Sequence, residues 1–409
     1  MKNKEVNLKI MLFTAGFPPP FVGGSVEYVF NIVSNMPPRT MVIHTSDACS
    51  LEAKILDKTL PQRIIRSSFI NHVQRGILGK RKKILFQKLE SITEYILWPF
   101  FAFSLIIRER PDVIQIGEHN FAAIAALFAR WTLGIPYLYI AYAEEITMLS
   151  KRPLHNRLFL TLIRNSSTII TVSDYTRNLL LNSGISSSQI ITILPSVSSR
   201  KNHEVDAELE LNLRTKYNLG DSKVILTVGS LEERKGHSSV IIALQEISRF
   251  FPSIKYIVVG SGPEEKALKL KADELGLKEQ VIFTGGINDQ ELNCLYEICD
   301  LFVMPHRQLQ NSLNTEGCPT VFLEASAHGK AVIGGNAGGV SDAIINEVTG
   351  YIIDGTDEVE LSNRVIELLS NNDLAVKMGL AGKSYAASLT PEANTKKVLK
   401  IYQNIVNKK

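Results

Sequence analysis

Residues 316–339 read EGCPTVFLEASAHGKAVIGGNAGG and predict a helix, a strand and a glycine-rich loop in succession. The stretch from Phe322 to His328 is compatible with a helix, and Gly329 is the kind of residue that commonly ends one. The apolar residues 331–333 then predict a short buried strand that leads into glycines. Open α/β sheets bind their ligands where strands end in such loops. The segment therefore predicts an α/β fold with a ligand site at its strand ends.

Two glutamates, Glu316 and Glu324, stand in this segment with seven residues between them. Glu324 has apolar neighbours on the predicted helix, so a purely solvent-facing position is not expected. A carboxylate fixed on a helix can accept hydrogen bonds from two adjacent hydroxyls, as a ribose offers, and its charge strengthens such bonds. Glu316 lies in the loop with Gly317 and Pro319, where a mobile carboxylate suits a hexose. We interpret the pair as a candidate sugar-nucleotide site; the alternative is two solvated surface groups.

The composition is typical of a soluble globular protein with two domains. The chain has 409 residues, which exceeds one ordinary core, and it is 45% hydrophobic and 21% charged. A net charge of +4 and the lack of a stripe of alternating basic and aromatic residues argue against nucleic acid as a partner. No metal-type spacing is present, so we expect free cytoplasmic thiols and no metal site. The cysteines are Cys49, Cys294, Cys299 and Cys318.

Short apolar runs alternate with helix-compatible segments in both halves of the chain. In the first half, the expected strands are Ile10–Thr14, Met41–His44, Val113–Ile116, Tyr137–Ala141, Thr168–Val172 and Ile190–Leu194. In the second half, they are Val224–Val228, Lys255–Val259, Val281–Thr284, Leu301–Met304, Ala331–Ile333 and Gly350–Ile353. Such alternation predicts parallel sheets with right-handed crossovers. The expected fold class is α/β, with two Rossmann-like doubly wound domains facing each other across a cleft.

A polar stretch that begins at Ser196 separates the two halves and is the best linker candidate. We therefore expect an N-terminal domain over residues 1–197 and a second domain over residues 198–390. The last helical segment, residues 391–409, follows the final strand and its helix, and we expect it to pack back on the N-terminal domain. Two facing domains would bring their glycine-rich strand ends to a common cleft.

The apolar run Ile96–Ile107 is the strongest candidate for contact with a membrane. It is shorter than the roughly 20 residues that span a bilayer. The basic run Lys80–Lys83 precedes it, and together they could form a surface that touches anionic lipid. The alternative is a core helix preceded by a solvated charged turn. The expected location is cytoplasmic, with a peripheral contact at the inner face of the membrane as an open alternative.

Strand ends in the second half of the chain are rich in glycine. Glycines follow the first three strands of this half, within Val228–His237, Val259–Glu264 and Thr284–Ile287. Backbone amides at a helix start, with a cation nearby, make an anion site, so Arg234 and Lys235 can meet a diphosphate. A solvated lysine at a helix start is the alternative for Lys235. Several such loops in register are stronger evidence for a phosphate site than one.

These motifs resemble those of the retaining family 4 glycosyltransferases of GT-B fold. The resemblance rests on Gly229–Gly236, on Val259–Glu264 and on the pair Glu316–Glu324 with its downstream glycines. Near the N-terminus, Thr14–Ser25 is similar to the family's first-strand loop, and Val172–Arg177 to its strand entering the interdomain region. The resemblance covers nearly the whole chain. Of these features, the acid pair is the specific one.

The resemblance implies transfer of a sugar from a nucleotide diphosphate sugar to an acceptor hydroxyl, with retention at the anomeric carbon. It implies an acceptor-binding N-terminal domain and a donor-binding second domain. In the family's roles, Glu316 contacts the donor sugar, Glu324 holds the ribose, and Lys235 neutralises the leaving diphosphate. No cofactor is implied, because the nucleotide sugar is a substrate. The acceptor could be a polysaccharide, a glycolipid, including a lipid-linked one, or a small molecule.

Three positions depart from the family pattern. Ser230 stands where an arginine usually follows Gly229, and the nearby Arg234 is a candidate substitute. Tyr142 stands where many relatives have a histidine near the sugar, and a core tyrosine is its alternative interpretation. The junction that begins at Pro195 lacks the usual glycine. These departures favour, as the alternative function, a catalytically weakened subunit that binds sugar nucleotide or a partner protein.

The candidate site residues fall into three groups. The catalytic candidates are Glu316, Lys235, Arg234 and Tyr142. The donor-binding candidates are Glu324, Gly229, Ser230, Gly260, Gly262, Gly285, Gly317, Cys318, Pro319 and Thr320. The candidates for an acceptor or phosphate loop are Gly23, Gly24 and His119, the last of which has a surface strand-end residue as its alternative.

Overall fold

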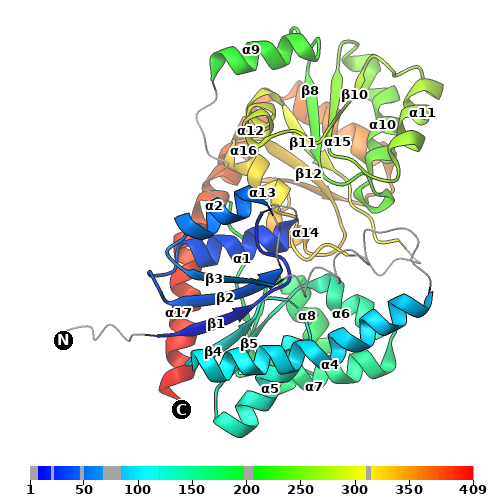
Figure 1. The fold of residues 1–409 in the computed structure, drawn as a ribbon. Coiled ribbons are helices and arrows are strands. Elements are labelled where there is room, and N and C mark those ends of the chain that lie inside the picture. The colour runs from blue at the N-terminus through cyan, green and yellow to red at the C-terminus, as the bar shows by residue number, and fades with distance from the viewer. Residues whose placement is uncertain are drawn as a thin grey trace. The chain divides into compact units, whose positions relative to one another are not determined.

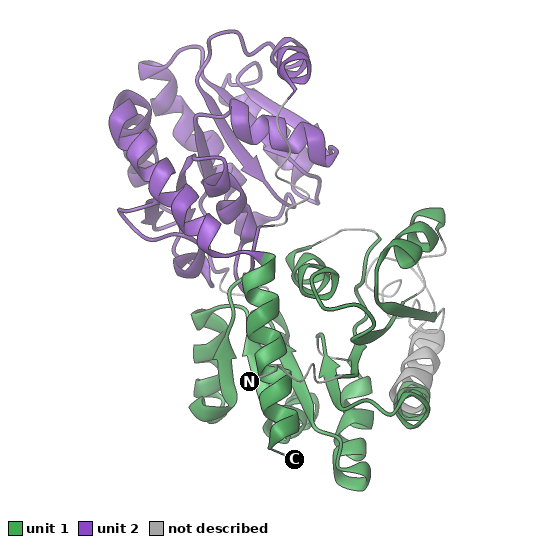
Figure 2. Ribbon diagram, turned by 90° about the vertical axis from the view of Figure 1, so that its left-hand side faces the viewer, with its two compact units in different colours: residues 1–194, 391–409 green, residues 195–390 purple. Residues whose placement is uncertain are grey.

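The chain folds into two compact units, which a computed structural model describes (Figure 2). The described residues are 8–19, 23–46, 50–67, 84–118, 120–197, 206–309 and 315–408, with side chains from residue 97 onward in the range that begins at 84. Unit 1 comprises residues 1–194 and 391–409, and unit 2 comprises residues 195–390. Unit 2 thus begins at Pro195 rather than at residue 198.

Unit 1 is built on a seven-stranded sheet with the order β3-β2-β1-β4-β5-β6-β7, in which every pair is parallel. The strands are β1 (Ile10–Phe13), β2 (Met41–Ser46), β3 (Arg63–Ser67), β4 (Val113–Ile116), β5 (Tyr137–Ala141), β6 (Thr168–Thr171) and β7 (Ile190–Thr192). β3 was not expected from the sequence. It is an edge strand whose residues are half-buried or exposed, and its two arginines interrupt the apolar run.

Helices cover both faces of this sheet (Figure 1). Those that contribute to the core on one face are α4 (Ile84–Glu109), α5 (Ala122–Leu133), α6 (Ala143–Ser150), α7 (Pro153–Arg164) and α8 (Asp174–Asn182). The core of the other face includes α1 (Gly24–Ser34) and α17 (Pro391–Asn407), which pack together, with α2 (Leu51–Thr59) at its margin. The C-terminal helix is therefore part of unit 1.

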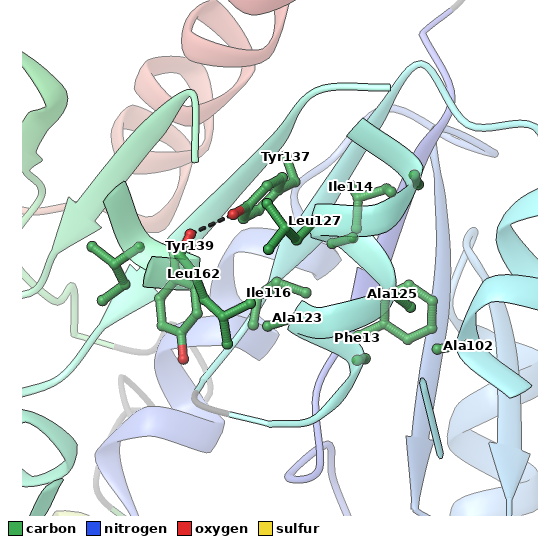
Figure 3. Close-up of a cluster of buried hydrophobic side chains, with 14 of the residues drawn as sticks. Phe13, Ala102, Ile114, Ile116, Ala123, Ala125, Leu127, Tyr137, Tyr139 and Leu162 are labelled. Carbon is green, nitrogen blue, oxygen red and sulfur yellow. Dashed lines mark hydrogen bonds between the residues drawn. The ribbon is translucent and has the colours of Figure 1, made fainter. Parts of the chain in front are cut away.

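Alanines bring α5 close to the sheet (Figure 3). Ala123 lies in one cluster with Phe13 and Ile114, all of them buried. In the same cluster, the hydroxyl of Tyr137 donates a hydrogen bond to the carbonyl of Leu162, so the one polar atom of that ring is satisfied. Small residues on the inner side of α5 leave its larger side chains to the outer side.

Unit 2 has a six-stranded parallel sheet with the order β10-β9-β8-β11-β12-β13. The strands are β8 (Val224–Val228), β9 (Lys255–Val259), β10 (Val281–Gly285), β11 (Leu301–Met304), β12 (Ala331–Gly335) and β13 (Gly350–Ile353). The helices are α9 (Ala207–Lys216), α10 (His237–Phe250), α11 (Glu265–Glu274), α12 (Asp289–Ile298), α13 (Thr320–Ala327), α14 (Val340–Ala343), α15 (Glu358–Ser370) and α16 (Asn372–Ser388). The fold class predicted from the sequence, two Rossmann-like α/β domains, is confirmed.

The order of each sheet creates a switch point, where neighbouring strands are joined by connections that run in opposite directions. It lies between β1 and β4 in unit 1 and between β8 and β11 in unit 2. Ligands of open α/β sheets bind beyond the carboxyl ends of the strands at such points. The loops that follow these four strands are therefore the first places to look for a site.

The run Ile96–Ile107 lies within α4, and only one side of it is buried. Trp98, Ala102 and Ile106 belong to the core, whereas Phe100 is exposed. The prediction of a core helix thus holds for one face of α4 only. Lys80–Lys83 lie outside the described residues. Within the described ranges, no helix is long and apolar enough to cross a membrane.

Candidate functional site

A cluster of three charged groups occupies the switch point of unit 2. Arg234 and Lys235 come from the loop after β8, and Glu316 comes from the loop that follows β11 and leads to α13. Lys235 Nζ lies 2.5 Å from Glu316 Oε1, and the guanidinium of Arg234 donates to the same oxygen. The side chains are only 17%, 10% and 19% exposed, respectively. The structure therefore brings together three of the four residues predicted as catalytic.

Charge holds Glu316 ionised in this half-buried position. Burial by itself would raise the pKa of the Glu316 carboxyl, but the charges of Lys235 and Arg234 outweigh it and hold that pKa well below its usual range. The cluster thus sets two cations around one carboxylate oxygen. A diphosphate that entered it could pair with both cations, since anions favour a site with preformed donors.

Ser230 and Glu232 hold the arginine in place. Ser230 Oγ donates to Glu232 Oε1 at 2.9 Å, and Arg234 Nε donates to Glu232 Oε2 at 2.8 Å. Burial acts to raise the pKa of Glu232, but these two partners lower it overall. Arg234, the candidate substitute for the arginine missing at position 230, is thus oriented by the Glu232 carboxylate, which was not predicted from the sequence. The only indication in the sequence was the position of Glu232, two residues from both Ser230 and Arg234.

Glu324 lies on α13, a helix that begins at Thr320, two residues before the predicted start, and ends at Ala327. Its side chain is almost fully buried. Tyr296 Oη donates to Glu324 Oε2 at 3.0 Å, and Thr320 Oγ1 donates to Oε1 at 3.3 Å. Both partners fix the orientation of the carboxylate on a rigid helix. The predicted ribose contact of Glu324 stays a prediction.

The glycines at the strand ends let neighbouring loops approach closely. Gly229 N donates to Val259 O at 2.9 Å, and a Cβ on Gly260 would lie 2.0 Å from the carbonyl oxygen of Gly229. A Cβ on Gly262 would likewise lie 2.5 Å from Leu231 O. These contacts give Gly260 and Gly262 a role in packing the loop that carries the two cations.

The remaining donor-binding candidates lie in the same set of loops. Gly285 ends β10 with a φ of 69° and open space where a Cβ would be. Gly317, Cys318 and Pro319 form the segment between Glu316 and α13. Burial raises the pKa of the Cys318 thiol, so the group stays protonated and packs as a small side chain. Their contact with a donor stays a prediction.

Two histidines beside the cluster were not predicted from the sequence. His237 Nε2 donates to the carbonyl oxygen of Ser230 at 3.2 Å and so braces the loop after β8. His306 follows β11, is 2% exposed, and has no hydrogen-bond partner on either ring nitrogen among the described residues. Burial lowers the pKa of His237 to about 4 and that of His306 to about 3, so both rings are neutral at physiological pH. The two histidines therefore add no charge to the cluster.

In unit 1, a half-buried glutamate shapes the loop after β1. Glu118 follows β4, and its Oε1 accepts hydrogen bonds from the backbone amides of Ala15 and Gly16, the latter at 3.0 Å, and from Thr14 Oγ1 at 3.2 Å. Burial raises the pKa of the Glu118 carboxyl, although all three donors act to lower it. Glu118 was not predicted as a site residue, whereas its neighbour His119 was, and His119 lies outside the described residues. The indication for Glu118 in the sequence was a carboxylate at a strand end.

Gly23 and Gly24 stand at the start of α1. Gly23 has a φ of 89°, a conformation that favours glycine, and no atom lies within 4 Å of the position that its Cβ would take. Gly24 is the first residue of the helix. Free amides at a helix start suit a phosphate or a carboxylate, which agrees with the prediction for these two glycines but does not test it.

Tyr142 lies between β5 and α6, where its backbone amide donates to Glu145 Oε1 at 3.1 Å. Its ring packs edge-on against Tyr28, with 6.4 Å between the ring centroids. The buried hydroxyl has no hydrogen-bond partner within the described ranges. Burial, and next the charge of Glu118, raise the pKa of the Tyr142 phenol well above its usual value, so it stays protonated. The phenol can donate a proton in a hydrogen bond but cannot act as a base.

Replacing Tyr142 with phenylalanine should raise the free energy of unfolding of the protein by about 1 kcal/mol, because a buried hydroxyl without a partner carries an uncompensated desolvation cost. Urea unfolding followed by circular dichroism measures this change in the free energy of unfolding. The control is Tyr28→Phe, which removes a hydroxyl that donates to the carbonyl of Ile193 at 3.1 Å and should lower stability by about 1 kcal/mol. Equal losses in both variants would show that Tyr142 has a partner.

Within the described ranges, no group of three or more histidine, cysteine, aspartate or glutamate side chains is placed to hold a metal ion. The cations at the switch point of unit 2 are side chains, Arg234 and Lys235.

Models of known families match both halves of the chain. Residues 22–200 match glycosyltransferase family 4, and residues 211–385 match glycosyl transferases group 1. The second match contains the Arg234–Lys235–Glu316 cluster and Glu324, and the first contains Glu118 and Tyr142. The candidate sites of both units thus lie within the matched regions.

Individual relatives agree with these matches. The chain is 35% identical over 231 residues to the GDP-mannose-dependent alpha-(1-6)-phosphatidylinositol monomannoside mannosyltransferase of Mycolicibacterium smegmatis, which covers 56% of this chain and 60% of that protein. It is 28% identical over 381 residues to the GDP-mannose-dependent monoacylated alpha-(1-6)-phosphatidylinositol monomannoside mannosyltransferase of Corynebacterium glutamicum. This match covers 92% of this chain and 93% of that protein.

The fold has solved counterparts as well. The crystal structure of Anabaena HepE in complex with UDP and glucose matches 97% of this chain and 100% of its own, with a TM-score of 0.74 at 17% identity. Such low identity supports the fold alone. With both halves matched by family models and both sheets shared with this fold, the chain belongs to the family 4 glycosyltransferases of GT-B fold.

Proposed function

We propose that the protein transfers a hexose from a nucleoside diphosphate sugar to a hydroxyl of a lipid-linked acceptor, with retention of the anomeric configuration. The observation that carries the proposal is the cluster of Arg234, Lys235 and Glu316 at the switch point of unit 2. It offers two cations to a diphosphate and a carboxylate to a sugar, on loops held by short contacts. The anion site is preformed, so the donor need not pay for its assembly.

The chemistry follows from where charge develops. The bond between the anomeric carbon and the diphosphate oxygen breaks, and the acceptor oxygen forms the new bond and passes its proton to the leaving diphosphate. Negative charge grows on the leaving diphosphate, where Lys235 and Arg234 stabilise it more in the transition state than in the ground state. Glu316 exchanges its cation partners for sugar hydroxyls. Glu324, fixed by Tyr296 and Thr320, takes the two ribose hydroxyls.

The identity of the substrates rests on the relatives. The two relatives described above are named for GDP-mannose and for phosphatidylinositol mannoside acceptors. A mannosyl donor and a glycolipid acceptor at a membrane surface are accordingly the proposed substrates of this chain, with the protein as a peripheral partner of the bilayer. In this proposal Arg234, which pairs with Glu316, takes the place of the absent arginine, and this argues against one of the two supports for the alternative of a weakened subunit.

Binding of nucleoside diphosphates tests the donor site without any knowledge of the acceptor. GDP at about 100 times its dissociation constant should stabilise the protein by about 2.7 kcal/mol, visible as a raised thermal midpoint. Glu324→Ala should reduce this shift, whereas Glu316→Ala should keep it and abolish sugar transfer. Glu274→Ala, an exposed glutamate on α11, is the matched control for both. No shift with GDP, UDP or ADP would refute the proposal.

Donor hydrolysis distinguishes the enzyme from the weakened subunit. The protein is incubated with GDP-mannose and other nucleotide sugars, and release of the nucleoside diphosphate is followed over time. Release that depends on Glu316 supports an active transferase. Binding without any release, in the presence of glycolipid acceptors as well, would support the alternative subunit.

A further inference from the structure

Unit 1 exposes a continuous apolar surface on α4 and α5. On α4 the exposed apolar residues recur at helical spacing, and on α5 Phe128 and Trp131 lie on the side opposite the alanines. We call this surface the α4–α5 face; it comprises Leu97, Phe100, Phe101, Ile107, Phe128 and Trp131. The two helices are joined within it, because Phe103 of α4 packs edge-on against Phe128 of α5, with 5.0 Å between ring centroids.

Large aromatic side chains are concentrated there. Of the five phenylalanine and tryptophan side chains that are largely exposed in the described ranges, four belong to the α4–α5 face. The fifth, Phe250, stands at the end of α10 in unit 2. Soluble proteins rarely expose a contiguous apolar patch of this kind without a partner for it.

A basic edge borders the face at the C-terminal end of α4. Ile107 is followed by Arg108, which together with Lys9 and Arg63 surrounds the single carboxylate of Glu109. The three cations are 40–59% exposed, whereas Glu109 is 5% exposed. The exposed Arg110 adds a further positive charge next to them. The solvent-facing charge of this edge is therefore positive.

We infer that the α4–α5 face docks unit 1 on an anionic lipid bilayer, with its aromatic residues at the level of the headgroups and its basic edge on lipid phosphates. Phenylalanine and tryptophan favour the interface between water and acyl chains, and arginine and lysine near it gain from anionic lipid. A second copy of the chain fits less well, since its own α4–α5 face, as far as the structure describes it, offers no anionic partner to the basic edge, whereas lipid phosphates do. In bringing the enzyme to a lipid acceptor the inference rests on the proposed function, but docking itself requires no turnover.

The two tryptophans of the chain make the test direct. Trp131 is 65% exposed on the α4–α5 face, and Trp98 is 2% exposed in the core beneath it. Vesicles of phosphatidylcholine with phosphatidylglycerol should shift the tryptophan emission to shorter wavelength, and brominated acyl chains should quench it. Trp131→Phe, which keeps only Trp98, should show neither effect. An unchanged emission in the wild-type protein, at low salt and excess lipid, would overturn the inference.

Co-sedimentation with the same vesicles supplies the second measurement. The double variant Phe100→Ser with Trp131→Ser should lower the vesicle-bound fraction by about tenfold or more, since two inserted side chains are lost. The matched control is Phe250→Ser, which removes an equally exposed aromatic side chain from unit 2 and should bind as wild type. Added salt or pure phosphatidylcholine should also weaken binding.

The outcomes separate this inference from the proposed function. The double variant should keep the thermal shift with GDP, because its changes lie outside the donor site. Vesicle binding without any response to GDP would leave docking standing and remove the donor proposal; the reverse would remove docking alone. A wild-type protein that is dimeric in sedimentation velocity, with a monomeric double variant and no vesicle binding, would assign the face to self-association instead.

Discussion

Replacing Lys235 with alanine is expected to lower kcat for sugar transfer by about 10²–10³-fold, the usual loss when one preorganised donor to a developing anion is removed. Its Nζ lies 2.5 Å from Glu316 at the switch point of unit 2, and the side chain is 10% exposed, so water replaces it poorly. Release of nucleoside diphosphate at saturating donor measures kcat. Lys235→Arg should retain more activity than alanine, because it keeps the charge with altered geometry.

The matched control is Lys269→Ala on α11, whose side chain is half exposed and pairs with Glu265. That variant should turn over like the wild type. If Lys235→Ala kept kcat and changed only KM, the lysine would bind donor and transition state equally, and its proposed part in stabilising the leaving group would be wrong.

The residues of the cluster could be predicted from the sequence, but the contacts between them could not. Glu316 and Lys235 could be singled out from a glycine-rich strand end and a family motif. That Arg234 shares the same carboxylate oxygen depends on where the loops after β8 and β11 meet, which is a property of the sheet order. Glu232 was missed for the same reason, since an acid in a charged loop looks solvated until its partners are placed.

The strands could be predicted where burial on both faces of the sheet requires apolar residues. Parallel strands covered on both faces are near-continuous apolar runs, and β1, β4 and β8 were recognised by this property. β3 carries two arginines and pairs only with β2, so its pattern is that of a loop. β3 forms because it pairs with β2, and its own residues do not indicate a strand.

The two switch points use the same device. In unit 1, a carboxylate from the loop after β4 contacts the loop after β1. In unit 2, a carboxylate from the loop after β11 contacts the loop after β8. Glu118 accepts from the amides of Ala15 and Gly16, and Glu316 accepts from Arg234 and Lys235. The difference lies in what is held: backbone donors fix the shape of a loop, whereas side-chain cations are free to exchange a carboxylate for a phosphate. This contrast agrees with a scaffolding role for Glu118 and a ligand-exchanging role for Glu316.

Replacing Gly236 with alanine should lower the free energy of unfolding of unit 2 by about 2–5 kcal/mol. Two costs add: an L-residue at a φ of 77° is strained by about 1–2 kcal/mol, and the new Cβ would lie 2.1 Å from the carbonyl oxygen of Pro305. The backbone must shift to relieve that contact, and with it the adjacent Lys235 and the bond from Arg307 N to Arg234 O. Activity should therefore fall together with stability, as urea unfolding and donor hydrolysis would show.

Gly276 is the control that separates strain from crowding. Its φ of 69° is nearly the same, but no atom lies within 4 Å of the position of its Cβ. Gly276→Ala should then cost only the strain, about 1–2 kcal/mol, and leave donor hydrolysis unchanged. If the two variants lost equal stability and kept equal activity, the close approach of the β8 and β11 loops would not be what positions Lys235. A larger loss at Gly236 in both measurements would tie the packing of that loop to the chemistry of the cluster.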